Sequence, residues 1–166
     1  PVHALMVSAL MKNFFDRFGF YGHRPKYFEK YALSVVTCSG YGAENAIEYM
    51  DKMLSVFGFN VAPPLELQFR AGKMPEKNKI LNKDKTIKAV DTFIDRIKKG
   101  EKDKPTISMM VPFGIFKYVS TIDKDTMSAD YEYYKDKEDY YYDTEIPFIK
   151  KFISKRVVDK IIAGFD

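Results

Sequence analysis

Residues 31–58 read YALSVVTCSGYGAENAIEYMDKMLSVFG, and this stretch decides the fold. It begins with a short, nearly continuous apolar run, Tyr31 to Val36, which is typical of a parallel strand covered on both faces. Gly40 and Gly42 then interrupt the run. Apolar residues return at helical spacing over residues 43–57, and Gly58 supplies a helix stop. The stretch therefore predicts a strand, a tight glycine loop and a helix.

The flanking segments continue this alternation of helices and strands. The predicted elements are a helix from Ala9 to Gly19 capped by Ser8, a loop over residues 19–30, a strand over residues 61–69 and a helix over residues 83–99 closed by Gly100. The order helix–strand–helix–strand implies crossover connections and a parallel sheet. We therefore predict an α/β fold.

The last third of the chain has a weaker pattern. Residues 105–120 are apolar with Pro112 and Gly114 in the middle, which predicts a helix that is broken or kinked. Residues 128–143 carry six tyrosines among acids and lysines, and these rings can either stack on a ligand or pack together with their hydroxyls at the surface. Residues 146–162 predict a closing, basic helix. We divide the chain into a domain over 1–100 and a mostly helical extension over 101–166.

Composition restricts the class of protein. The chain has 166 residues, 46% of them apolar and 30% charged, which is typical of a globular domain with a real core. The net charge of +4 is unevenly spread, because residues 70–104 hold 12 Lys/Arg against 6 Asp/Glu, whereas residues 123–145 hold 3 against 9. A basic block can be a solvated helix face or can meet an anionic partner. No RNA-binding or helix-turn-helix motif accompanies it, so we expect no nucleic-acid partner.

The single cysteine and the lack of long apolar runs bear on the cellular setting. One cysteine excludes an internal disulfide and a zinc site built from several cysteines, and it suits a reducing cytoplasm. No apolar run approaches the length of a membrane helix, and no signal-peptide pattern is present. Carboxylate pairs such as Asp123 and Asp125 lie in polar segments typical of solvated surface. We expect a cytoplasmic protein with no membrane partner and no metal site.

Cys38 lies at the end of the predicted strand and is the first candidate for chemistry. A nucleophilic cysteine needs a histidine as its base. The chain has only His3 and His23, and nothing in the sequence brings either of them to Cys38. A cysteine at a strand end is more often a small core residue. We therefore expect no catalytic side chain at this position.

Two loops are expected to meet at the carboxyl edge of the sheet, where open α/β folds bind ligands. If Pro1 and Val2 end a strand, residues 3–7 form an apolar loop beside the loop over residues 37–42, which is rich in small groups and backbone N–H donors. Such a pair suits a flat heteroaromatic ligand. The alternatives are a strand-to-helix turn that merely requires glycine, and a solvated histidine at position 3.

Two motifs carry a family resemblance. Residues 1–17, PVHALMVSALMKNFFDR, resemble the S-P-x-Y-x-x-x-x-S-x-x-x-K-x-F-x-D-R segment of the flavodoxin-like NAD(P)H-dependent FMN reductases and their relatives, the iron–sulfur flavoproteins. Residues 23–42, HRPKYFEKYALSVVTCSGYG, resemble the family's H-R-P-x-F-x-x-K-x-A-x-x-V-x-T-x-G-x-x-G continuation. The resemblance runs from residue 1 to about residue 62 and returns weakly near residues 105, 129 and 140.

The resemblance implies a flavodoxin-like, three-layer parallel sheet, incomplete in this chain, that binds FMN at its carboxyl edge. The family's first flavin loop corresponds to Pro1, Val2 and His3, followed by Ala4, Leu5 and Met6. The second corresponds to Thr37, Cys38, Ser39, Gly40, Tyr41 and Gly42. His3 stands where the family usually has tyrosine, and Ser39 where glycine is common.

The resemblance implies an oxidoreductase that passes electrons from NAD(P)H through FMN to a quinone, a flavin or a redox protein. It also implies a homodimer, as is often found in this family. The cofactor carries the chemistry, so no catalytic acid or base is implied. The family's phosphate loop, its first two strands and the cysteine cluster of the iron–sulfur branch precede the matched segment and are not among these residues. We expect the chain to be the latter part of a longer protein. An interaction module without FMN is the alternative.

Overall fold

The computed structural model describes residues 1–70, 72 and 74–164 and divides the chain into two compact units. The first unit comprises Pro1–Gly22 and Lys26–Asp103. The second comprises His23–Pro25 and the residues from Lys104 onward. A segment of three residues near the N-terminus therefore belongs with the C-terminal unit.

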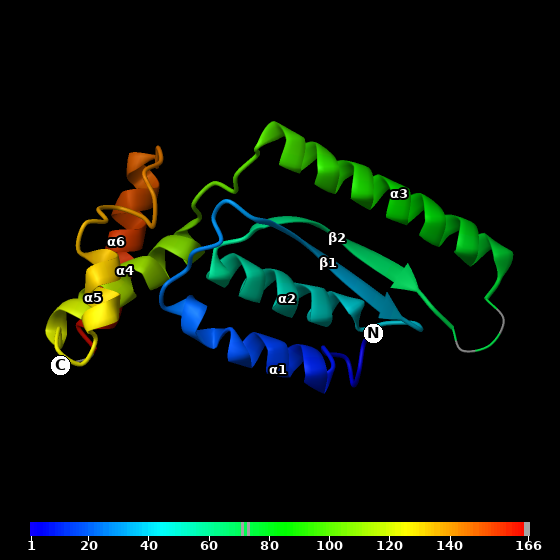
Figure 1. The fold of residues 1–166 in the computed structure, drawn as a ribbon, viewed down its shortest axis with the longest axis horizontal. Coiled ribbons are helices and arrows are strands. Elements are labelled where there is room, and N and C mark those ends of the chain that lie inside the picture. Colours follow the sequence, from blue (N-terminus) through cyan, green and yellow to red (C-terminus); the bar gives the residue numbers. More distant parts are fainter. Residues whose placement is uncertain (71, 73, 165–166) are drawn as a thin grey trace. The chain divides into compact units, whose positions relative to one another are not determined.

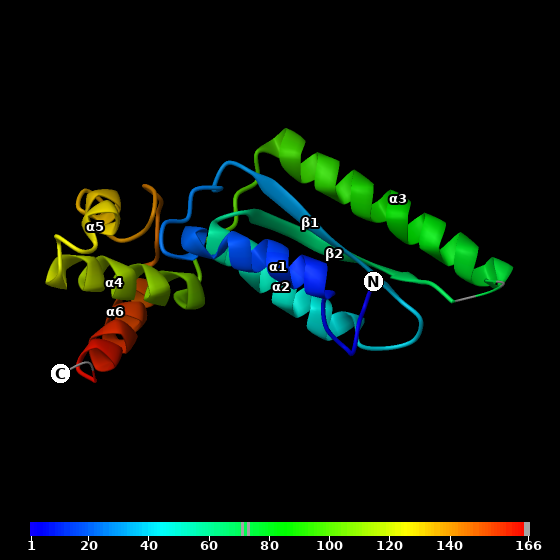
Figure 2. The ribbon, with the colours of Figure 1, turned by 60° about the horizontal axis from the view of Figure 1, so that its bottom comes forward.

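The first unit is a small α/β layer structure (Figure 1). Its elements are α1 (Ala9–Arg17), the 3-10 helix η1 (Gly19–Gly22), β1 (Tyr31–Cys38), α2 (Ala43–Phe57), β2 (Asn60–Gln68) and α3 (Glu76–Lys99). The strands pair in parallel. Helices α1 and α2 lie on one side of this two-stranded sheet and α3 on the other, as both views show (Figure 2). The predicted α/β class, with an incomplete flavodoxin-like sheet, is confirmed.

The strand register contains one irregularity. It shifts by one residue between Leu33 and Val35 of β1, opposite Pro63 and Pro64 of β2. Because proline has no backbone N–H, two successive prolines cannot continue the ladder, and the sheet absorbs them as a bulge. Regular pairing resumes beyond the bulge and extends to Cys38. The carboxyl end of β1 is therefore held in a defined position.

The core of the first unit fills the space between β1 and the helices α1 and α2. Side chains alternate along a strand, so every second residue of β1 faces these helices. The core cluster consists of Phe15, Val36, Cys38, Ala43, Ala46, Met50 and Phe57. It reaches from the end of β1 to the first residue of α2. The loop between these two elements is thus anchored at both of its ends.

Several predicted helix ends are confirmed. The Ser8 hydroxyl accepts a hydrogen bond from the Met11 N–H at 3.3 Å and caps α1. Gly58 ends α2 with φ of 97°, and a Cβ there would lie 2.9 Å from the Phe28 ring. The predicted start of α3 is wrong, because this helix begins at Glu76. The acidic side chain in its first turn, which favours a helix N-terminus, is that of Glu76 and not the expected Asp84.

The second unit is helical and contains α4 (Ile107–Ile122), α5 (Ser128–Tyr134) and α6 (Phe148–Ile162). The apolar segment was predicted to be a broken or kinked helix, and it forms one unbroken helix, α4, with Pro112 inside it. Helices α4 and α6 approach closely at Gly114, where a Cβ would lie 2.7 Å from Val158 Cγ2. Within the described ranges, no helix is both long and apolar enough to span a membrane.

The tyrosine cluster forms the core of the second unit. Tyr134, Tyr140 and Tyr141 are all buried. The Tyr134 hydroxyl donates to the backbone carbonyl of His23, and the Tyr133 hydroxyl donates to that of Pro25. The expectation that the tyrosine hydroxyls lie at the surface is wrong for these two residues. Burial raises the pKa of both, so they remain neutral donors at ordinary pH.

Charged and aromatic contacts complete the attachment of residues 23–25. Arg24 Nε lies 3.1 Å from Asp130 Oδ1, and His23 Nδ1 lies 3.5 Å from Asp130 Oδ2. The His23 imidazole packs on the Phe116 ring, with 4.3 Å between the ring centroids. The HRP motif of the sequence therefore packs within the C-terminal unit rather than forming part of an open loop.

Candidate functional site

The two loops predicted from the sequence lie side by side. The Val2 N–H donates to the Thr37 carbonyl at 2.9 Å, while the next carbonyl, of Cys38, accepts from the Phe69 N–H at 2.7 Å. Successive carbonyls of a strand point to opposite edges. Val2 therefore lies along the edge of β1 that faces away from β2, and Figure 1 shows the N-terminus beside the carboxyl end of β1.

The first loop is a tight turn over His3–Met6. The His3 N–H donates to the Met6 carbonyl at 2.8 Å, and the Met6 N–H returns a bond of 2.9 Å to the His3 carbonyl. The two central residues, Ala4 and Leu5, have φ of 45° and 66°. For residues with a Cβ this conformation costs about 1–2 kcal/mol each. Strain of this kind is retained where surrounding contacts impose it and is found often at functional sites.

Gly42 of the second loop is the point of contact with this turn. Its φ is 89°, and a Cβ there would lie 2.8 Å from Leu5 Cδ2 and 3.2 Å from Leu5 Cα. Only glycine fits both the conformation and the space. The alternative interpretation of this loop was a strand-to-helix turn that requires glycine. Gly42 does require glycine, because of its positive φ and its contact with Leu5 of the first loop.

The remaining residues of the two loops present an accessible surface. Leu5 and Met6 are 44% and 40% exposed, and Tyr41 is 79% exposed. Ser39 and Gly40 are also exposed, and no atom lies within 4 Å of the position that a Cβ on Gly40 would take. Apolar side chains thus stand on one loop, and small groups with free space stand on the other.

Cys38 is a buried thiol within this arrangement. Its Sγ donates to Glu66 Oε1 at 3.4 Å. Burial raises the pKa of the Cys38 thiol, the bond to the Glu66 carboxylate raises it further, and the backbone N–H of Gly40 acts in the opposite direction. A protonated, buried thiol is a poor nucleophile. The burial and raised pKa of Cys38 do not favour a nucleophilic role, and its place as a neighbour of the flavin stays a prediction.

Two carboxylates that bond to residues of β1 were missed by the sequence analysis. Glu66 lies on β2 beside Cys38, and Asp51 on α2 accepts a hydrogen bond of 2.5 Å from the Ser34 hydroxyl. Burial raises the pKa of Asp51, and the bond from Ser34 partly opposes that shift. Ser34 is a polar residue inside a predicted apolar strand, and a buried hydroxyl needs a hydrogen-bond partner. Its presence in the sequence could have indicated a polar partner such as Asp51.

Metal ligands do not gather in the described part of the chain. Across residues 1–70, 72 and 74–164, no group of three or more His, Cys, Asp or Glu side chains is arranged to hold a metal ion. The chemistry of the loop pair instead fits an organic ring. The apolar side chains of Leu5 and Met6 can cover a ring face, and Ser39 and Gly40 present a small, accessible backbone toward a polar edge.

Comparison with known proteins found similarity in the segment that contains both loops. Residues 1–73 match the sequence model of the NADPH-dependent FMN reductase family. A stretch of 59 residues is 44% identical to an iron–sulfur flavoprotein of Archaeoglobus fulgidus, a match that covers 35% of this chain and 27% of that protein. No solved structure gives a significant match. The resemblance drawn from the motifs is confirmed, and the similarity to the FMN reductase family covers residues 1–73.

Proposed function

We propose that this protein binds FMN at the loop pair and is a flavin-dependent oxidoreductase that takes electrons from NAD(P)H and passes them to a quinone, a flavin or a redox protein. The contact of Leu5 with Gly42 carries the proposal, because it unites the two family motifs into one surface. The match of residues 1–73 to the FMN reductase family supports the choice of cofactor.

The residues of the site would bind and orient the cofactor. Leu5 and Met6 would pack on the face of the isoalloxazine ring, because their side chains are apolar and accessible. Backbone groups of residues 39–42 would meet its polar edge. The bound flavin supplies the hydride and electron chemistry. Because the flavin carries the chemistry, the proposal assigns no catalytic acid or base to the protein. Cys38 would contribute only packing.

The other parts of the proposal concern the setting of the site. Residues 1–100 would be the C-terminal portion of a flavodoxin-like domain, and residues 101–166 an extension of it. The single, buried cysteine suits a reducing cytoplasm. We also propose that the protein is a homodimer.

A substitution at Gly40 tests the proposed FMN site directly. Because a Cβ there meets no atom within 4 Å and the backbone is not left-handed, Gly40→Leu should leave the fold intact while filling the space beside the loop. FMN affinity, measured by quenching of flavin fluorescence, should fall by roughly tenfold or more, about 1.4 kcal/mol. Gly19→Leu is the matched control, because a Cβ on Gly19 also meets nothing within 4 Å but lies away from the loop pair.

The same preparation tests the reaction. Purified protein should carry a visible flavin spectrum, or acquire one on addition of FMN, and NADPH should bleach it. Equal FMN affinity in the wild type and in both variants would refute the loop pair as the site. A full-length protein that binds no FMN would favour the alternative, an interaction module without the cofactor.

A further inference from the structure

Helix α6 exposes two neighbouring rows of side chains along one side. Residues four apart lie above one another on a helix, so each row follows that spacing. Phe148 is 80% exposed and Ile149 is 66% exposed, and the residues that follow them in the two rows are exposed as well. The first row changes from aromatic to basic and the second is apolar throughout: Phe148, Phe152, Arg156 and Lys160, then Ile149, Ile153, Val157 and Ile161. We call these residues the α6 outer face.

The opposite side of α6 makes the contacts inside the unit. Ser154 and Val158 are buried there, and Val158 is the residue that approaches Gly114 of α4. The helix therefore packs through its smaller side chains and leaves the larger apolar ones exposed. Contiguous apolar surface of this kind typically marks an interaction site, whereas apolar residues exposed singly are ordinary.

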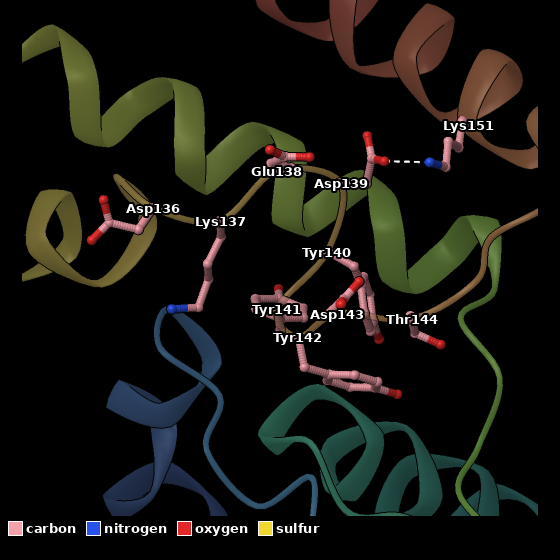
Figure 3. A pocket seen from close by; sticks show the side chains of 10 residues that line it. All are labelled: Asp136, Lys137, Glu138, Asp139, Tyr140, Tyr141, Tyr142, Asp143, Thr144 and Lys151. Atoms are coloured by element: carbon pink, nitrogen blue, oxygen red, sulfur yellow. Dashed lines mark hydrogen bonds and ion pairs between the residues drawn. The ribbon is translucent and has the colours of Figure 1, made fainter.

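Two of the basic residues of α6 are used within the unit. Lys150 Nζ donates to the Pro105 carbonyl at 3.0 Å. Figure 3 shows the Asp139 carboxylate directed at Lys151, and these two side chains form an ion pair. Lys151 lies on the side of Ser154, because residues three apart are neighbours on a helix. The acidic segment over residues 136–144 therefore meets α6 away from the outer face.

The other three basic residues remain available to a partner. Lys155, Arg156 and Lys160 are exposed, and none of them forms an ion pair with a residue that the structure describes. The Arg156 guanidinium lies over the Phe152 ring, 5.2 Å from its centroid. Asp159 is the single acid of the helix. Aromatic rings and uncompensated positive charge thus stand together on the outer face.

A partner for this face must offer apolar contact and negative charge next to each other. The surface of an anionic bilayer has both, since a layer of negative headgroups covers the acyl chains. The long stems of lysine and arginine keep their charged ends among the headgroups while apolar neighbours enter the acyl layer. A fluid surface also requires no matching shape, so it suits the convex side of a single helix.

We propose that α6 binds the surface of anionic membranes, lying in the interface with its outer face toward the lipid. The aromatic and aliphatic side chains of the outer face would enter the boundary of the acyl layer, and Lys155, Arg156 and Lys160 would contact the headgroups. The sequence analysis expected no membrane partner because no segment was long enough to span a bilayer, and a helix that lies on the surface needs no such length. The proposal goes beyond the flavin chemistry and does not depend on it.

The first experiment measures binding of the full chain to vesicles by co-sedimentation. The wild type should bind vesicles of phosphatidylcholine mixed with phosphatidylserine, and the double variant Phe148→Ser/Phe152→Ser should bind roughly 30-fold more weakly or worse. Both side chains are at least half exposed, so the fold should persist, and circular dichroism checks it. Leu10→Ser is the matched control, because Leu10 is 82% exposed on α1 and should leave vesicle binding unchanged.

The second experiment tests the charges of the outer side. Each cation near an anionic bilayer strengthens binding by about fivefold, so replacing Lys155, Arg156 and Lys160 with glutamine should weaken it by roughly 100-fold. Added salt should weaken wild-type binding in the same direction. The control replaces three exposed lysines of α3 with glutamine, which removes equal charge from the other unit and should change binding by less than about threefold: Lys83, Lys88 and Lys98.

Three results would overturn the proposal. One is a wild-type chain that stays in solution with phosphatidylserine vesicles, and another is equal binding to vesicles of phosphatidylcholine alone. The third is a Phe148→Ser/Phe152→Ser variant that binds as tightly as the wild type. If the wild type ignores vesicles but self-associates in sedimentation velocity and this variant does not, the outer face belongs to a second copy of the chain instead. Protein with and without FMN should bind vesicles alike, so either proposal can fail while the other stands.

Discussion

Replacement of Gly42 by alanine tests how the two loops are held together. The φ of 89° is unfavourable for any residue with a Cβ, and the new methyl group would lie 2.8 Å from Leu5 Cδ2 and 3.2 Å from Leu5 Cα. The conformational term is about 1–2 kcal/mol, and the steric term is about 1–3 kcal/mol. The lower entropy of the unfolded alanine chain offsets about 0.4–1 kcal/mol. We expect a net loss of about 2–4 kcal/mol in the free energy of unfolding.

Urea unfolding followed by circular dichroism measures this loss, and two further variants separate its causes. Gly40→Ala is the control, because no atom lies within 4 Å of its Cβ position and it should change stability little. Adding Leu5→Ala to Gly42→Ala removes the clash with Cδ2 but not the approach to Cα or the positive φ. The double variant should therefore recover only part of the loss attributed to Gly42→Ala.

The comparison of the two glycines can refute the reasoning. If Gly42→Ala is as stable as Gly40→Ala, the contact between the loops does not exist as described. If Leu5→Ala restores full stability, side-chain crowding alone explains the effect and the left-handed backbone contributes nothing. FMN affinity measured on the same variants shows whether the loop contact supports binding.

Three further predictions concern buried titratable groups. Because burial raises the pKa of Cys38, its thiol should react with iodoacetamide at pH 8 more slowly than free cysteine does, and unfolding in urea should remove the difference. Asp51→Asn should raise the free energy of unfolding at pH 7, since burial disfavours the charged carboxylate, and this gain should vanish in acid as Asp51 becomes protonated. Burial raises the pKa of Tyr141 from 10.0 to about 12, so its contribution to stability should be complete below pH 10 and lost between pH 10 and 12. Tyr141 should contribute about 1.4 kcal/mol per pH unit to the fall in the free energy of unfolding there, in addition to the fall due to Tyr133 and Tyr134, and tyrosinate absorbance and denaturant titrations can follow the two quantities together.

The sequence predicted secondary structure best where the local pattern of apolar residues was clear and had glycines at its ends. The run from Tyr31 and the helical spacing up to Phe57 predicted β1 and α2 closely, because strand burial and helix periodicity agree there with clear glycine boundaries. The start of α3 was placed too late, because residues 76–82 are mostly polar and show no apolar stripe. Helix α5 was not predicted at all, since its tyrosines read as a polar segment until partners elsewhere in the chain bury them.

The sequence predicted that the two loops lie together, but it did not predict which contacts hold them. Topology alone brings the ends of β1 and of the N-terminal segment to one sheet edge. The contact between Leu5 and Gly42 depends on two positive φ values at Ala4 and Leu5 that neither residue type favours. No single-sequence rule would place non-glycine residues in that region. Likewise, the bond from Cys38 to Glu66 depends on strand register, which the two prolines of β2 alter.

The attachment of residues 23–25 to the C-terminal unit has a consequence for synthesis and folding. Two of its hydrogen bonds join residues 108 and 111 positions apart in the chain. During translation, His23 and Pro25 are made long before Tyr133 and Tyr134. Their backbone carbonyls can therefore accept these two hydrogen bonds only after Tyr133 and Tyr134 have been made. The C-terminal unit is therefore completed by a segment that is made well before its helices, and a fragment that starts after Pro25 would lack part of this unit.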